Sequence, residues 1–119
     1  MKINSELTQA IIEGIQEKKG KSITVADLSG IHTAPCQQFV VCTANSPQHA
    51  DAITDSIEEF ARKKGGEKPT AICGRDNGIW IAMDYGTVMV HTFVPDAREF
   101  YDIEHLWDDA ELMQVPDLD

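Results

Sequence analysis

Apolar residues recur every three or four positions in two stretches of the chain, a spacing that places them on one face of a helix. The first stretch begins at a capping residue, Asn4 or Ser5, and ends before Gly20. The second begins at Ser46-Pro47 and ends near Gly65-Gly66. The apolar faces consist of Leu7, Ala10, Ile11 and Ile15 in the first stretch and Ala50, Ile53, Ile57, Phe60 and Ala61 in the second. The pattern therefore predicts two amphipathic helices.

Five shorter stretches alternate between apolar and polar residues or run apolar throughout, as strands do. They cover residues 23–28, 39–43, 70–74, 79–84 and 87–94. The last three are separated by tight-turn signals, Asp76-Asn77-Gly78 and Tyr85-Gly86, so we expect them to form an antiparallel meander. The strands on either side of the second helix pair either in parallel or through a crossover.

The segment after the last strand predicts one more helix and then a tail. Pro95 ends the strand, and Asp96 with Glu99 three residues later forms a capping-box-like helix start. Residues 111–119 contain Pro116 and three acids, so we expect a frayed or disordered acidic tail.

The predicted order is α-β-β-α-β-β-β-α, in one domain over residues 1–110. Such an order implies an α+β, two-layer fold with a mixed five-stranded sheet. We expect the helices to cover mainly one face of the sheet and to leave the other face open to a partner.

Charge and length narrow the class of protein. A chain of 119 residues is long enough to bury one core without disulfides or metals. No apolar run approaches the roughly 20 residues of a membrane helix, and the start lacks the apolar segment of a signal peptide, so we expect a cytoplasmic protein. The net charge of −10 disfavours direct contact with nucleic acid and favours a basic protein partner, although solubility alone would also explain it.

The sequence contains few residues in patterns typical of catalytic, metal-binding or disulfide sites. The three cysteines form no CxxC pair, which argues against disulfides and zinc and favours small buried side chains in a reducing compartment. A nucleotidyltransferase-type enzyme needs carboxylates converging on Mg²⁺ and a phosphate-binding loop. No Asp-x-Asp pair lies on a predicted strand. A phosphate-binding loop would lead into a helix, but Gly65-Gly66 is followed by Glu-Lys-Pro. The sequence thus predicts no enzyme, no metal site and no cofactor.

Residues 80–110 hold most of the aromatic side chains of the chain, together with two histidines and an arginine. In chain order the notable residues are Trp80, Asp84-Tyr85-Gly86, Val90-His91, Phe93, Arg98, Tyr101, Asp102, Ile103, Glu104, Leu106 and Trp107, preceded upstream by the segment 39–49. In this ordered set the chain resembles the ribosomal silencing factor family, also called the Iojap family, over about residues 3–110. It departs from the family pattern at Pro35-Cys36-Gln37-Gln38 and at Thr87, where an acid commonly follows the glycine.

This resemblance implies a binding protein rather than an enzyme. Members of the family bind the large ribosomal subunit through its protein fourteen and sterically block joining of the small subunit, which lowers translation when nutrients are scarce. Their fold resembles a nucleotidyltransferase core without its catalytic carboxylates, and they are often homodimers when free. A role in assembly of the large subunit would require the same docking and is the alternative.

Four predicted partner-binding residues lie on or beside the last two predicted strands. Trp80 is either an anchor on the open face or a core residue. Asp84 caps the amides of the hairpin turn or contacts the partner, and Tyr85 at the turn tip is expected to be exposed. We expect His91 to be half-buried and bonded to Glu104 or Asp84. Metal ligation is disfavoured, because no second ligand lies at a suitable spacing.

The other predicted partner-binding residues follow in the last helix, namely Arg98, Tyr101, Glu104, Leu106 and Trp107. Arg98, Tyr101 and Glu104 are spaced to share one side of a short helix, and Arg98 is placed to pair with Asp102 at i,i+4. A negative rim around Trp107 would suit a basic ribosomal protein. That rim would consist of Asp102, Glu104, Asp108 and Asp109. Alternatively, Leu106 and Trp107 only attach the helix to the sheet.

Overall fold

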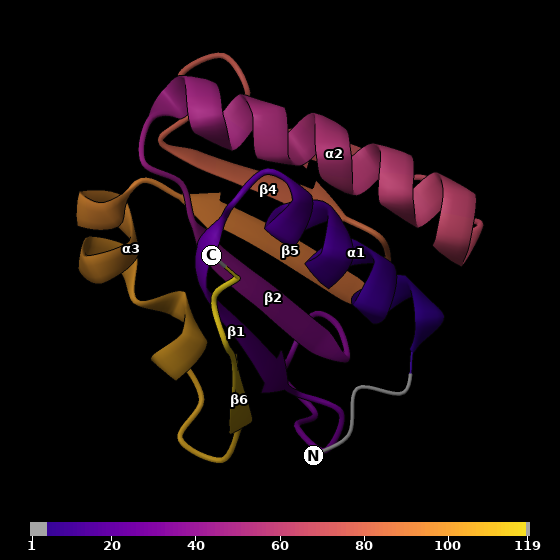
Figure 1. The fold of residues 1–119 in the computed structure, drawn as a ribbon. Helices are drawn as coiled ribbons and strands as arrows, with labels where there is room; N and C mark the ends of the chain where they lie inside the picture. Colours follow the sequence, from indigo (N-terminus) through magenta and orange to yellow (C-terminus); the bar gives the residue numbers. More distant parts are fainter. Residues whose placement is uncertain (1–4, 119) are drawn as a thin grey trace.

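The computed structural model of the chain describes residues 5–118, which form a six-stranded mixed sheet with helices on both faces (Figure 1). The elements in chain order are α1 (Glu6–Glu17), β1 (Lys21–Asp27), β2 (Gln38–Thr43), α2 (Pro47–Gly65), β3 (Ala71–Cys73), β4 (Trp80–Asp84), β5 (Val88–Phe93), α3 (Pro95–Tyr101), the 3-10 helix η1 (Ile103–His105) and β6 (Glu111–Val115). The α+β class predicted from the sequence is confirmed. Within the described residues, no helix is long and apolar enough to cross a membrane.

Local capping signals place the two long helices where the sequence predicted them. The Ser5 hydroxyl accepts a hydrogen bond from the Thr8 amide at 3.2 Å and starts α1. The Ser46 hydroxyl accepts from the His49 amide at 3.1 Å and starts α2. Gly66 ends α2 in the left-handed conformation, with φ of 69°, which glycine adopts without strain.

The strand order in the sheet is β3-β4-β5-β2-β1-β6. The predicted meander is confirmed, because β3 pairs with β4 and β4 with β5 in antiparallel register. The strands that flank α2 in the sequence are not neighbours, since β2 pairs in parallel with β5 instead of β3. This parallel pair joins the β3-β4-β5 meander to β2, β1 and β6.

The prediction of five strands with a frayed tail was wrong. Residues 111–115 form β6, which pairs antiparallel with β1 from Asp27 opposite Glu111 to Ile23 opposite Val115 (Figure 1). Without β6, β1 would be an edge strand whose unpaired peptide groups could pair with another chain, and β6 covers that edge. Leu112 adds apolar packing against the sheet, which the acids around it had obscured.

One face of the sheet is covered by α1 and α2, as predicted, and holds the larger core (Figure 1). The opposite face was predicted to be open, and this was wrong for much of its area. Phe39, Val41 and Phe93 lie there in a second apolar cluster, which also contains Ala97 of α3 and Ile103 of η1. These side chains are too apolar to face water, so the C-terminal segment folds back over them.

The last helix begins differently from the sequence prediction. Pro95 occupies the first turn of α3, Val94 is the N-cap residue, and no side chain caps the helix. The predicted capping box of Asp96 and Glu99 is therefore not formed. The fixed φ of proline suits the first turn, where its missing amide hydrogen leaves no bond unmade.

Candidate functional site

The second face of the sheet carries the aromatic residues that the sequence singled out. The Trp80 ring lies 5.0 Å from the Phe93 ring and 4.7 Å from the Tyr101 ring, measured between centroids. Its indole N–H donates to Nδ1 of His91 at 3.0 Å. The sequence left open whether Trp80 is a core residue or part of the surface. Trp80 is half-buried, so it packs on the core and also contributes to the surface.

His91 is a core residue held by Trp80. Its side chain is buried, and the predicted bond to Glu104 or Asp84 is not formed, since Trp80 is the partner instead. Because Nδ1 accepts the indole hydrogen, the ring proton of the neutral form lies on Nε2, which has no partner among residues 5–118. Burial lowers the pKa of His91 to about 4, and the ring stays neutral at pH 7.

The neutral His91 is expected to make the fold sensitive to acid. An unfolded histidine titrates near 6.5, whereas the folded pKa is about 4. Below pH 6.5 the unfolded chain therefore binds a proton that the folded chain does not, and the free energy of unfolding falls by up to about 3 kcal/mol on the way to pH 4. Above pH 6.5 this group contributes no pH dependence.

Denaturant unfolding at several values between pH 7 and pH 4 measures this effect. The His91→Gln variant keeps a hydrogen-bond acceptor but does not titrate, so its stability should fall less steeply over this range. The exposed His32 provides a control, and His32→Gln should keep the wild-type slope. Equal slopes for wild type and His91→Gln would contradict the assignment.

The β4–β5 hairpin turn confirms one prediction and overturns another. Asp84 accepts a hydrogen bond from the Gly86 amide at 2.7 Å and caps the turn, with Gly86 at φ of 84°. Tyr85 was predicted to be exposed, but only 5% of it is accessible and it packs into the core beneath α1 and α2. Burial, with the charges of Glu58 and Glu67 nearby, raises the pKa of Tyr85 to about 12.

Arg98 and Glu104 form a buried ion pair that ties the C-terminal segment to the sheet. The Arg98 guanidinium donates to Glu104 Oε2 at 2.7 and 3.1 Å, and both side chains are largely buried. It also donates to the Thr24 and Thr43 hydroxyls at 3.0 and 2.9 Å and to the Ser22 carbonyl. Five hydrogen bonds from one side chain thus link α3 and η1 to β1 and β2.

The predicted arrangement of this segment was wrong in three respects. Helix α3 ends at Tyr101, and Asp102 adopts a left-handed conformation with φ of 45°, so Arg98 and Glu104 do not share one helix. Asp102 bonds to His105 Nδ1 at 2.5 Å instead of pairing with Arg98. Glu104 points inward, so the negative rim at the surface consists of Asp102, Asp108 and Asp109.

Phe100, Tyr101 and Trp80 form a surface that we call the aromatic patch. Phe100 is 81% exposed and meets Tyr101 edge-on at 5.0 Å, while Tyr101 is 46% exposed and rests on Trp80. Exposed aromatic rings that pack against one another are typical of binding hot spots. The sequence prediction included Tyr101 and Trp80 but missed Phe100. The only sign of its exposure in the sequence is its position on α3, off the face that Ala97 and Tyr101 share.

Leu106 and Trp107 have different roles although they are neighbours. Leu106 is 60% exposed and lies at the surface. Trp107 packs edge-on against Phe39 at 5.6 Å, and its indole N–H donates to the Thr33 hydroxyl at 3.3 Å. Trp107 therefore attaches the segment to the sheet, whereas Leu106 does not.

The cysteines divide by position. Cys42 is buried, and burial raises its pKa to about 11, as expected of a small core side chain. Cys36 is half-buried, while Cys73 is exposed on the edge strand β3, which differs from the prediction that all three are buried.

The comparisons with known proteins agree with this fold and these motifs. The family model described as "Ribosomal silencing factor during starvation" matches residues 2–119. A ribosomal silencing factor of Halalkalibacterium halodurans is 30% identical over 112 residues, covering 94% of this chain and 94% of that protein. A crystal structure of a Chromobacterium violaceum protein superposes with a TM-score of 0.81 at 33% identity, covering 91% of this chain and 88% of that one.

A more distant relative comes from an organelle. The mouse protein named "Mitochondrial assembly of ribosomal large subunit protein 1" is 28% identical over 83 residues, which span 65% of this chain and 36% of that protein. Given a family match along nearly its full length and bacterial relatives of the same size, the chain belongs to the ribosomal silencing factor family.

Proposed function

We propose that this protein binds the large ribosomal subunit through its protein fourteen and sterically blocks joining of the small subunit. The aromatic patch, on a chain of net charge −10, is the observation that carries the proposal. Family membership supplies the ribosome as the partner. In this mechanism the protein acts in the cytoplasm by occupying a surface and catalyses no reaction.

The chemistry of the patch suits a basic protein. Phe100 and Tyr101 offer rigid apolar area with few rotatable bonds, so little entropy is lost when they are buried in a partner. The exposed carboxylates of Asp102, Asp108 and Asp109 would meet lysine and arginine side chains at the rim of the interface. A contact of about 800 Å² on each partner is enough for stable docking without chemistry.

Removing the two most exposed rings should weaken docking without unfolding the protein. We expect the double variant Phe100→Ala/Tyr101→Ala to bind large subunits at least about 30-fold more weakly, since hot-spot truncations cost about 2 kcal/mol or more. Co-sedimentation with purified large subunits measures the affinity, and light scattering measures 70S formation. Circular dichroism checks the fold.

Phe60 provides the matched control because it is a partly exposed aromatic residue on α2, on the opposite side of the sheet. Phe60→Ala should bind like wild type. If wild-type protein bound neither large subunits nor isolated protein fourteen, the proposed function would be wrong. If the double variant bound as tightly as wild type, the interface would lie elsewhere on the molecule.

A role in assembly of the large subunit is the second candidate, and the name of the mouse relative favours it. Both roles require the same docking surface, so a binding assay does not separate them. Depletion of the protein followed by a profile of ribosomal particles does: precursors of the large subunit should accumulate only if the protein serves assembly.

A further inference from the structure

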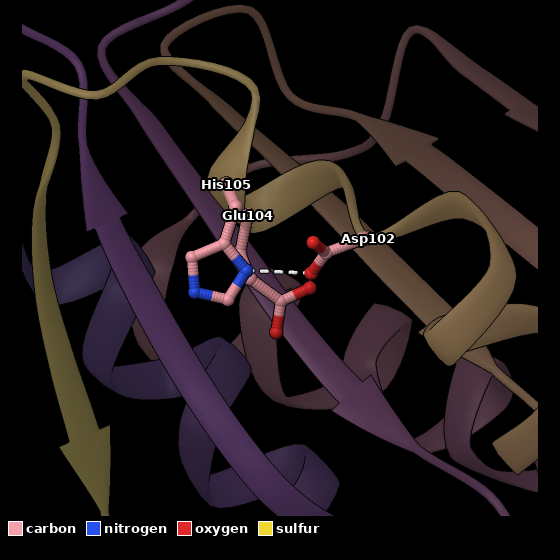
Figure 2. Close-up of side chains that lie close together, drawn as sticks. All are labelled: Asp102, Glu104 and His105. Carbon is pink, nitrogen blue, oxygen red and sulfur yellow. Dashed lines mark hydrogen bonds and ion pairs between the residues drawn. The ribbon is translucent and has the colours of Figure 1, made fainter.

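Three side chains with metal-binding atoms meet where α3 ends and η1 begins, next along the chain from Phe100 and Tyr101. Asp102, Glu104 and His105 each offer one ligand atom, and these atoms lie within 4.8 Å of one another (Figure 2). The left-handed conformation of Asp102, with φ of 45°, turns the chain sharply between α3 and η1.

One carboxylate oxygen in this cluster is buried without a hydrogen-bond partner. The Glu104 side chain is 8% exposed, and its Oε2 accepts both hydrogen bonds from Arg98. Its Oε1 receives no hydrogen bond from any of residues 5–118. A buried, unsatisfied carboxylate oxygen is costly, and a bound cation is one of the few partners that removes this cost.

The side chains of the other two ligands are accessible to a cation and to water. The side chains of Asp102 and His105 are more than half exposed and are joined only by the 2.5 Å contact between Oδ1 and Nδ1. In Figure 2 the His105 ring faces the Asp102 carboxylate, and the Glu104 carboxylate lies beside both. Ligand atoms around a tetrahedral zinc ion lie about 3.4 Å apart, given metal bonds of about 2.0–2.2 Å, so small rotations of two surface side chains would complete the site.

We propose that Asp102, Glu104 and His105 bind a divalent transition-metal ion, with Zn²⁺ as the best fit. An imidazole nitrogen with two carboxylate oxygens suits zinc, whereas Mg²⁺ and Ca²⁺ prefer oxygen ligands alone. Arg98 holds the Glu104 carboxylate through Oε2, in the way that hydrogen-bond donors orient metal-binding carboxylates in other proteins. Three protein ligands leave the fourth zinc position to water.

Titration of the full chain with ZnCl₂ tests the site, by calorimetry together with NMR of the His105 ring. The experiment uses a Cys73→Ser background, because the exposed Cys73 thiol is itself a zinc ligand. We expect one zinc ion per chain, a shift of the His105 ring signals, and affinity at least tenfold weaker in His105→Gln and in Asp102→Asn. Both positions are exposed, so the variants should fold normally.

His32→Gln is the matched control, since His32 is an exposed histidine outside the cluster. It should bind zinc like the background protein, and Mg²⁺ at the same concentration should not displace the zinc. Absence of zinc binding would overturn the proposal. Binding that neither His105→Gln nor Asp102→Asn weakens would overturn it as well. Ribosome docking is a separate measurement, and its failure would leave this test unaffected.

Discussion

Replacing Arg98 with alanine is expected to lower the free energy of unfolding by about 3–5 kcal/mol, the usual cost of leaving one partner of a buried ion pair unpaired. Glu104 would stay buried with neither oxygen bonded to a described residue. The Thr24 and Thr43 hydroxyls would lose their donor at the same time. Urea or thermal unfolding of purified protein measures the loss.

Arg75 provides a control that separates burial from ion pairing. It contacts Asp51, Asp55 and Glu58 at 2.7 to 3.2 Å, but these acids are largely exposed. Exposed ion pairs contribute about 0–1 kcal/mol each, so Arg75→Ala should cost much less than Arg98→Ala. Equal losses for the two variants would show that burial does not set the energy of the Arg98 pair.

Trp80→Ala is expected to cost about 2–4 kcal/mol, because truncating a well-packed aromatic residue costs up to about 5 kcal/mol and Trp80 is half-buried. The variant would lose ring contacts to Phe93 and Tyr101 and would leave His91 Nδ1 without its donor. Trp80→Phe keeps most of the packing, so it should cost about 1–2 kcal/mol, mainly for the lost hydrogen bond.

Phe100→Ala is the matched control for Trp80, and unfolding curves for all three variants make the comparison. Phe100 is 81% exposed, so its truncation should change the free energy of unfolding by no more than about 0.5 kcal/mol. If Trp80→Ala were as mild, the contacts of Trp80 would add nothing to stability. Because Trp80→Ala is expected to destabilise the fold, weaker docking by this variant would reflect partial unfolding as well as a lost contact with the partner.

Elements whose signals lie close together in the sequence were predictable. Ser5 and Ser46 cap the two long helices within the first turn, and glycine ends α2 at Gly66. The turn signals between β4 and β5 placed the hairpin, with Asp84 bonded two residues along the chain. These features depend on contacts over a few residues, so a local pattern contains most of the information.

The burial of the site residues could not be predicted from such local patterns. Tyr85 is part of a turn signal, but it packs under α1 and α2, which lie far from it in the sequence. Glu104 looked like a surface acid until Arg98, six residues earlier and in another element, proved to be its partner. The exposure of Phe100 depends on which face of α3 packs on the sheet, and a helix of seven residues gives only a weak local signal for that face.

The sequence by itself determined the α+β class, the helices and meander, and the resemblance to the ribosomal silencing factor family, because capping residues, turn residues and ordered motifs are local. Only the tertiary structure decided that residues 111–115 form β6 and that Arg98 and Glu104 are buried anchors. It also decided that the aromatic patch consists of Phe100 and Tyr101 resting on Trp80. Strand pairing and burial depend on which distant segments meet, and a periodic pattern along one segment does not contain that information.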